Sequence, residues 1–143
     1  MCVQGLIVVP TKELARQIYN QLVDFKKYEP LLKINLLIGN SDTDEQSRIL
    51  KSSKPQIIIS TPAKALEFIK NKQITKNIKT LIMDEFDMLI DFGFANQIDE
   101  LFKLINNINL QKICCSATAH ESLANKFKKY LTNTKTVSLG DSI

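Results

Sequence analysis

Short apolar runs alternate along this chain with longer stretches in which apolar residues recur every three or four positions. Short runs bounded by polar residues, Gly or Pro are typical of buried strands, whereas the recurring pattern is typical of amphipathic helices. The runs predict strands at 6–9, 33–38, 57–59, 80–83 and 113–115, with a short sixth strand at 136–139. The stretches between them predict helices at about 11–28, 41–52, 61–69, 98–108 and 118–131.

This alternation predicts one α/β domain, with a parallel sheet and helices on both of its faces. A chain of 143 residues is long enough for a single core. Thr11 is the expected cap of the first helix. Phe25 in the first helix and Ile49 in the second belong to the predicted apolar faces, as does Ile108 in the fourth.

Polar residues follow the predicted strands. Right-handed crossovers place the turns after parallel strands along one edge of the sheet, so these residues are expected to lie together. Each segment alone also fits an ordinary turn or helix cap, but five on one edge favour a site. The segments are Pro10-Thr11-Lys12, Gly39-Asn40, Thr61-Pro62-Ala63-Lys64, Asp84-Glu85-Phe86-Asp87 and Ser116-Ala117-Thr118.

The segment after the fourth strand carries three carboxylates, at Asp84, Glu85 and Asp87. Like charges this close repel one another unless a cation neutralises them. Mg²⁺ takes oxygen ligands and is usually shared with substrate phosphates, so it is the natural candidate. A solvated acidic turn is the alternative interpretation of the same residues.

The net charge of +4 and the isoelectric point of about 8.9 fit a polyanionic partner without requiring one. Only Arg16 and Arg48 are Arg, and the other basic residues are Lys. Lys binds phosphate as a point charge and lacks the bidentate fork of Arg. Contacts with a nucleic-acid backbone are therefore easier to form here than base-specific contacts.

The three cysteines and the single His120 form no pattern of zinc ligands. Cys114 and Cys115 fit small apolar residues of a buried strand, and reduced thiols suit an intracellular compartment. No apolar run approaches the ~18 residues of a membrane span, so no membrane association is expected.

In their order, these polar segments resemble the motifs of the first RecA-like domain of DEAD-box RNA helicases. Residues 10–17 resemble P-T-R-E-L-A-x-Q, 61–64 resemble T-P-G-R, 84–87 resemble D-E-A-D and 116–118 match S-A-T. The resemblance implies a RecA-like P-loop NTPase fold, a three-layer α/β/α sandwich, over residues 1–143. It also implies an ATP-dependent RNA helicase with ATP and Mg²⁺ as cofactors.

The resemblance assigns catalytic roles to the acidic segment. Asp84 would hold Mg²⁺ through its water shell, and Glu85 would position and deprotonate the water that attacks the γ-phosphate. Asp87, Ser116 and Thr118 would couple the nucleotide site to closure against a second RecA-like lobe.

The resemblance also implies contacts with single-stranded or duplex RNA through the sugar-phosphate backbone. The residues expected to make them are Pro10, Thr11, Lys12, Gly39, Asn40, Thr61, Pro62 and Lys64.

The sequence departs from the family pattern at five positions. Lys12 and Lys64 stand where the family has Arg, so bidentate phosphate clamps become point charges. Asn40 and Ala63 replace Gly, and Phe86 replaces the small Ala of the acidic motif. A ring at position 86 must find an apolar pocket.

The phosphate-binding loop G-x-x-x-x-G-K-[ST] is not found among these residues. We therefore expect an N-terminally truncated domain, inactive in isolation, with a gap between the strand before Ser116 and the strand at 136–139. That last strand is expected to shift beside Cys114, or another chain to fill the gap. The alternative functions are a non-catalytic RNA- or protein-binding module on the same scaffold and an ATPase that acts on DNA.

Overall fold

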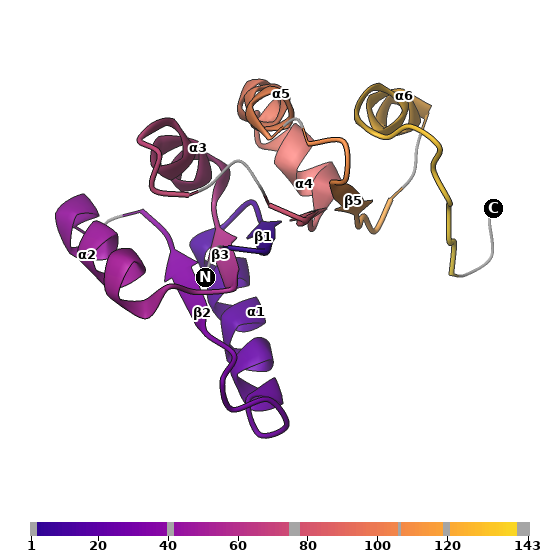
Figure 1. The fold of residues 1–143 in the computed structure, drawn as a ribbon. Coiled ribbons are helices and arrows are strands. Elements are labelled where there is room, and N and C mark those ends of the chain that lie inside the picture. The colour runs from indigo at the N-terminus through magenta and orange to yellow at the C-terminus, as the bar shows by residue number, and fades with distance from the viewer. Residues whose placement is uncertain (1–2, 40–41, 75–77, 106, 119–120, 140–143) are drawn as a thin grey trace.

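The computed structural model describes residues 3–39, 42–74, 78–105, 107–118 and 121–139. Its strands and helices alternate along the chain, as the sequence predicts (Figure 1). The elements are β1 (Gly5–Val8), α1 (Lys12–Phe25), β2 (Ile34–Leu37), α2 (Thr43–Ser53), β3 (Ile57–Ser60), α3 (Pro62–Lys70), β4 (Thr80–Met83), α4 (Phe86–Asp91), α5 (Ala95–Leu104), β5 (Gln111–Cys114) and α6 (Glu121–Tyr130).

The five strands form one parallel sheet in the order β2-β3-β1-β4-β5. The central strand β1 pairs with β3 and β4 in the same register, so that Gly5 lies opposite both Ile57 and Thr80. Every strand has four residues. All five therefore finish at one side, which we call the carboxyl edge of the sheet.

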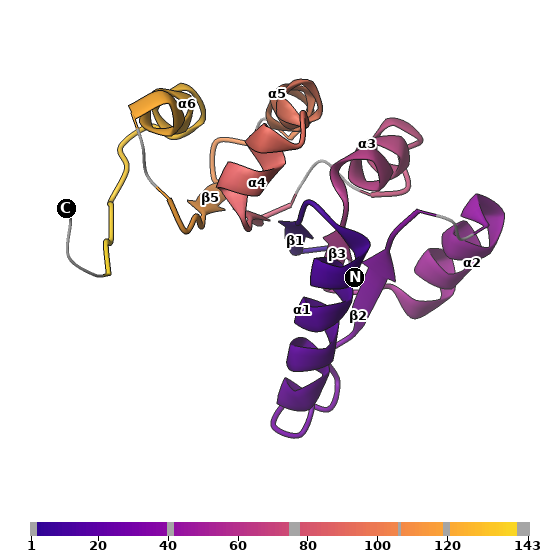
Figure 2. The ribbon, with the colours of Figure 1, turned by 180° about the vertical axis from the view of Figure 1, so that it is seen from behind.

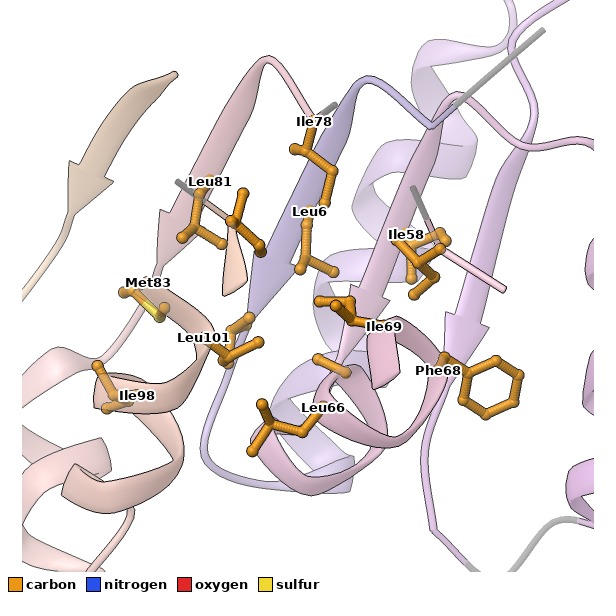
Figure 3. Packing of buried hydrophobic residues seen from close by; sticks show 14 of the residues in the cluster. Leu6, Ile58, Leu66, Phe68, Ile69, Ile78, Leu81, Met83, Ile98 and Leu101 are labelled. Atoms are coloured by element: carbon orange, nitrogen blue, oxygen red, sulfur yellow. The ribbon is translucent and has the colours of Figure 1, made fainter. Parts of the chain in front are cut away.

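Helices cover both faces of the sheet, which confirms the predicted α/β architecture. On one face α3, α5 and α6 lie side by side, and Leu6 and Leu81 of the strands pack against Ile69 and Leu101 of the helices (Figures 1 and 3). On the other face α1 packs over β2 and β3, and Ala15 lies in its contact (Figure 2). In the described ranges, no helix is both long and apolar enough to span a bilayer.

The single helix expected at 98–108 is wrong in its bounds. Two helices, α4 and α5, lie between β4 and β5, and Gly93 between them adopts a left-handed backbone with φ of 86°. Only glycine adopts that conformation without strain, so the helix ends there. Ile105 is buried just after α5, but Ile108 is 98% exposed and lies outside the helix.

Two residues expected on buried faces are exposed. The side chains of Phe25 and Ile49 are 60% and 48% exposed, and α1 ends at Phe25 rather than near Tyr28. The 14 residues of α1 span about 21 Å, whereas a four-residue strand spans about 13 Å. The last turn of α1 therefore extends beyond the sheet (Figure 1).

The sixth strand expected at 136–139 is also wrong. These residues form no strand, and Val137 and Leu139 are 76% and 94% exposed. Among the described residues, β5 is an edge strand with β4 as its one ladder partner. Residues 136–139 do not pair with the open side of β5, so the expected shift of this strand beside Cys114 does not occur. The edge position also explains why Cys114 is half-buried and Cys115 exposed, rather than both buried.

The Phe68→Ala variant is expected to lower the free energy of unfolding by about 3–5 kcal/mol. Phe68 on α3 is fully buried, so its removal leaves a cavity in the larger core. Phe92→Ala is the control, because Phe92 is 54% exposed, and its loss should stay within about 0.5 kcal/mol. Urea denaturation followed by circular dichroism measures both, and equal losses would contradict this assignment of the core.

Candidate functional site

Hydrogen bonds attach the acidic segment to both neighbouring strands at the carboxyl edge. The Asp84 N–H donates to the carbonyl of Val8 at the end of β1, at 3.0 Å. The Phe86 N–H donates to the carbonyl of Cys115, directly after β5, at 2.9 Å. The segment is therefore fixed on both sides by backbone groups.

Glu85 has a left-handed backbone, with φ of 51° and ψ of 49°. For a residue with a Cβ this conformation costs about 1–3 kcal/mol and persists only where the surroundings impose it. Its N–H donates to Oδ1 of Asp84 at 2.9 Å. The turn between β4 and α4 is thus strained at the residue that was predicted to act on water.

Asp87 lies beside the segment Ser116–Thr118. The Thr118 hydroxyl donates to Oδ2 of Asp87 at 3.0 Å, and the Ser116 hydroxyl donates to the Thr118 carbonyl at 2.8 Å. Burial raises the pKa of the Asp87 carboxyl, but hydrogen bonds from the Thr118 hydroxyl and the Met88 N–H outweigh burial and hold the pKa below its ordinary value. The Asp87 carboxylate therefore remains charged at neutral pH.

The carboxylates at this edge fit a metal ion that is shared with a substrate, rather than a site in which the protein supplies all the ligands. Across the described ranges, no group of three or more His, Cys, Asp or Glu side chains could hold a metal by itself. Mg²⁺ at phosphoryl-transfer sites commonly uses one or two carboxylates together with water and substrate phosphates. Asp84 and Glu85 are both half-buried, and they offer such a partial set.

An open groove of about 530 Å³ lies along the same edge of the sheet, at the ends of β1, β2 and β3. It is lined by six of the eight residues that were predicted to bind RNA, and by Ala63 of the same predicted edge segments. The lining residues are Pro10, Thr11, Lys12, Glu13, Gly39, Thr61, Ala63, Lys64, Glu67 and Phe94. Pro62 is buried as the first residue of α3, and Asn40 lies outside the described residues.

The two lysines of the groove differ in their surroundings. The Lys64 ammonium donates to the Thr43 hydroxyl at 3.1 Å and pairs with Glu67 at 3.2 Å. The Lys12 side chain lies over Gly39, where an added Cβ would stand 3.4 Å from its Cε. Lys64 is therefore held in place, whereas in the described contacts Lys12 packs over a glycine.

Helix starts face this groove. The Thr11 hydroxyl caps α1 by accepting from the Leu14 N–H at 3.2 Å, as predicted. Thr61 is the N-cap residue of α3 and Pro62 follows it, but in the described contacts the Thr61 hydroxyl makes no cap hydrogen bond. Helix N-termini favour anions, since their first N–H groups lack carbonyl partners within the helix.

Sequence reasoning missed Glu13, Glu67 and Phe94 in the groove. Glu67 was detectable, because it lies three positions after Lys64 on one helix, where side chains of opposite charge meet. Phe94 comes from the turn between α4 and α5, and no local pattern places that turn against the groove.

The comparison with protein families gives one decisive match: the DEAD/DEAH box helicase family covers residues 2–126. The chain belongs to this family. It is 39% identical over 134 residues to the DEAD-box ATP-dependent RNA helicase CshB of Listeria monocytogenes, covering 92% of this chain and 30% of CshB. It is 32% identical over 145 residues to the ATP-dependent RNA helicase ROK1 of Eremothecium gossypii, covering 96% of this chain and 25% of ROK1.

Solved structures of DEAD-box proteins share the fold. The yeast splicing factor Prp28 superposes with a TM-score of 0.83 at 25% identity, over 91% of this chain and 31% of Prp28. Mss116, solved with ssRNA and UDP-BeF, superposes with a TM-score of 0.82 at 20% identity, over 91% of this chain and 28% of Mss116. The RecA-like fold expected from the motifs is thereby confirmed, and the chain spans about 30% of CshB.

The Thr118→Val variant is expected to raise the pKa of Asp87, because it removes the largest of the hydrogen bonds that lower it. Thr118→Ser keeps a hydroxyl and is the matched control. An NMR titration of the Asp87 carboxyl carbon measures the shift, and an unchanged pKa in Thr118→Val would contradict the role of this bond.

The same bond predicts a pH dependence of stability. A carboxyl group whose pKa is lower in the folded state stabilises that state above its unfolded pKa, and this contribution is lost as the pH falls through the folded pKa. The difference in unfolding free energy between the wild type and Thr118→Val should therefore shrink as the pH falls through the folded-state pKa of Asp87.

Proposed function

We propose that this chain carries the water-activating and RNA-binding residues of an ATP-dependent RNA helicase. The observation that supports this most is the common position of the acidic segment and the groove along one carboxyl edge. In open α/β sheets ligands bind at that edge. The family match supplies the chemistry that the position alone does not specify.

The acidic segment would act on the phosphates of ATP. Asp84 would hold Mg²⁺ through water, and the bound ion would neutralise charge on the phosphates. Glu85 would orient the attacking water and accept its proton. Asp87 would keep the segment attached to Thr118, a bond that is already formed in this structure.

The groove would bind the sugar-phosphate backbone of RNA. Lys12 and Lys64 bring positive charge, and the starts of α1 and α3 bring backbone N–H groups. Such contacts give affinity without reading bases. The ssRNA in the Mss116 structure supports RNA as the ligand, and contact with a second RecA-like lobe is part of the same proposal.

A non-catalytic RNA-binding module is the second candidate. The groove is formed within the described residues, whereas the 143 residues contain no phosphate-loop sequence. RNA binding by this chain would fit both candidates, but ATP hydrolysis by the whole protein that contains it would fit only the first.

The variants Lys12→Gln and Lys64→Gln are expected to weaken RNA binding by this chain about equally for all sequences. Each removes one phosphate contact, so the slope of log affinity against log salt should fall by about 0.7 for single strands. Fluorescence anisotropy with labelled single-stranded RNA of mixed and uniform sequence measures this. Lys128→Gln on α6 is the control. Unchanged slopes in both groove variants would show that the groove is not the RNA-binding site.

Glu85→Gln in the whole protein is expected to lower ATP turnover by at least about 100-fold, because the amide cannot accept the proton of the water. Binding of a fluorescent ATP analogue should persist. Glu29→Gln, in the exposed turn after α1, is the matched control. Phosphate release measures turnover, and near-normal turnover in Glu85→Gln would refute the assignment.

A further inference from the structure

Phe86 stands inside the acidic segment, where the D-E-A-D pattern of the family has Ala. Its side chain is completely buried, although Glu85 before it is half-buried at the carboxyl edge. A ring at this position needs an apolar pocket, and the structure supplies one from α5 and α6.

The pocket is an aromatic cluster made of Phe86, Phe102, Phe127 and Tyr130. The Phe86 ring stacks on Phe127 of α6, with 4.8 Å between centroids and 25° between planes. Tyr130, one turn further along α6, meets Phe86 edge-on at 6.2 Å and 77°. Phe102 of α5 stacks on Tyr130 at 4.7 Å and 9°. Stacked and edge-on pairs at these distances are attractive beyond the area they bury.

Polar bonds fix the outer side of the aromatic cluster. The Tyr130 hydroxyl donates to Oδ1 of Asp99 on α5, and the Lys129 ammonium pairs with the same carboxylate. The Lys112 ammonium of β5 donates to the Tyr130 carbonyl at 3.3 Å and lies 5.4 Å from the centre of the Phe102 ring. The position of α6 is therefore set by both α5 and β5.

Two connections lead from α6 to the same turn of the acidic segment. The first is the Phe127–Phe86 stack. The second runs through Thr118, three residues before α6 begins, whose hydroxyl binds Asp87. The strained backbone of Glu85 lies directly before these two anchored residues. A strained conformation persists only when the surrounding structure holds it in place. The Phe86–Phe127 stack and the Thr118–Asp87 hydrogen bond are such surroundings for Glu85.

We propose that Phe86 is a positioning residue, and that its stack on Phe127 makes the left-handed backbone of Glu85 depend on the docking of α6. A shift of α6 would move Phe86, loosen its N–H bond to Cys115 and release Glu85. Where it concerns hydrolysis, the inference rests on the proposed function, since Glu85 is there the residue that activates water.

The test uses amide hydrogen exchange by NMR in this chain, with the Phe86 N–H as the reporter. Phe127→Leu keeps apolar volume and removes the ring, and Phe127→Tyr keeps the ring. Leu123→Ala, 2% exposed on the same helix, is the control for a general loss of core packing. Phe127→Leu should speed exchange at Phe86 about tenfold relative to the amides of β4, and Phe127→Tyr should restore it to within about twofold.

An exchange rate at Phe86 that rises no more in Phe127→Leu than in Leu123→Ala would overturn the proposal. Kinetics of the whole protein separate it from the proposed function. Phe127→Leu is expected to lower kcat for ATP hydrolysis and leave the KM for ATP within about twofold. If the wild type hydrolyses no ATP, the proposed function fails while the exchange result still decides the positioning role. If KM rises and kcat does not change, the positioning of Glu85 is refuted.

Discussion

The hydrogen-bonded ladder of the parallel sheet does not stop where its strands end, and the candidate site depends on that continuation. The Val9 N–H donates to Ser60, the Asp84 N–H to Val8 and the Cys115 N–H to Met83, all at 2.9–3.0 Å. Each bond extends a strand pairing into a turn at the carboxyl edge. The sheet itself therefore places the start of the acidic segment at Asp84, and backbone positions set in this way are more precise than those of free loops.

The groove is organised differently, because side chains rather than ladder bonds define it. Lys64 is oriented by Thr43 and Glu67, and Lys12 by its packing over Gly39. In the proposed function, cationic side chains would suit a polymer backbone that is bound at any sequence, and a turn fixed by backbone bonds would suit the placing of one water molecule. The same edge thus combines an acidic part placed by backbone bonds with a cationic part placed by side-chain contacts.

Much of the fold and of the candidate site could be predicted from local sequence patterns. The features that could not be predicted depend on contacts between distant parts of the chain. Runs such as Ile57-Ile58-Ile59 predicted strands because β-branched residues favour them. The strand-end rule predicted that segments 84–87 and 116–118 would lie along one edge, and Asp87 and Thr118 form a hydrogen bond there. The strand at 136–139 failed because a strand needs a partner that no local pattern reveals. The left-handed Glu85 and the Phe86–Phe127 stack were also hidden, since each depends on contacts between distant elements.

The edge position of β5 explains why the side-chain contacts around α6 matter. Among the described residues β5 has one ladder partner, so only one of its sides is held by backbone bonds. After it Ser116 is half-buried and Ala117 and Thr118 are exposed, and the Thr118 hydroxyl binds Asp87 of the acidic segment. Because backbone bonds restrain the open side of β5 so little, the position of α6 depends on the aromatic cluster and on the Lys112 bond to the Tyr130 carbonyl. The ring at position 86 connects the acidic segment to α6, a contact that the short side chain of Ala could not make from that turn.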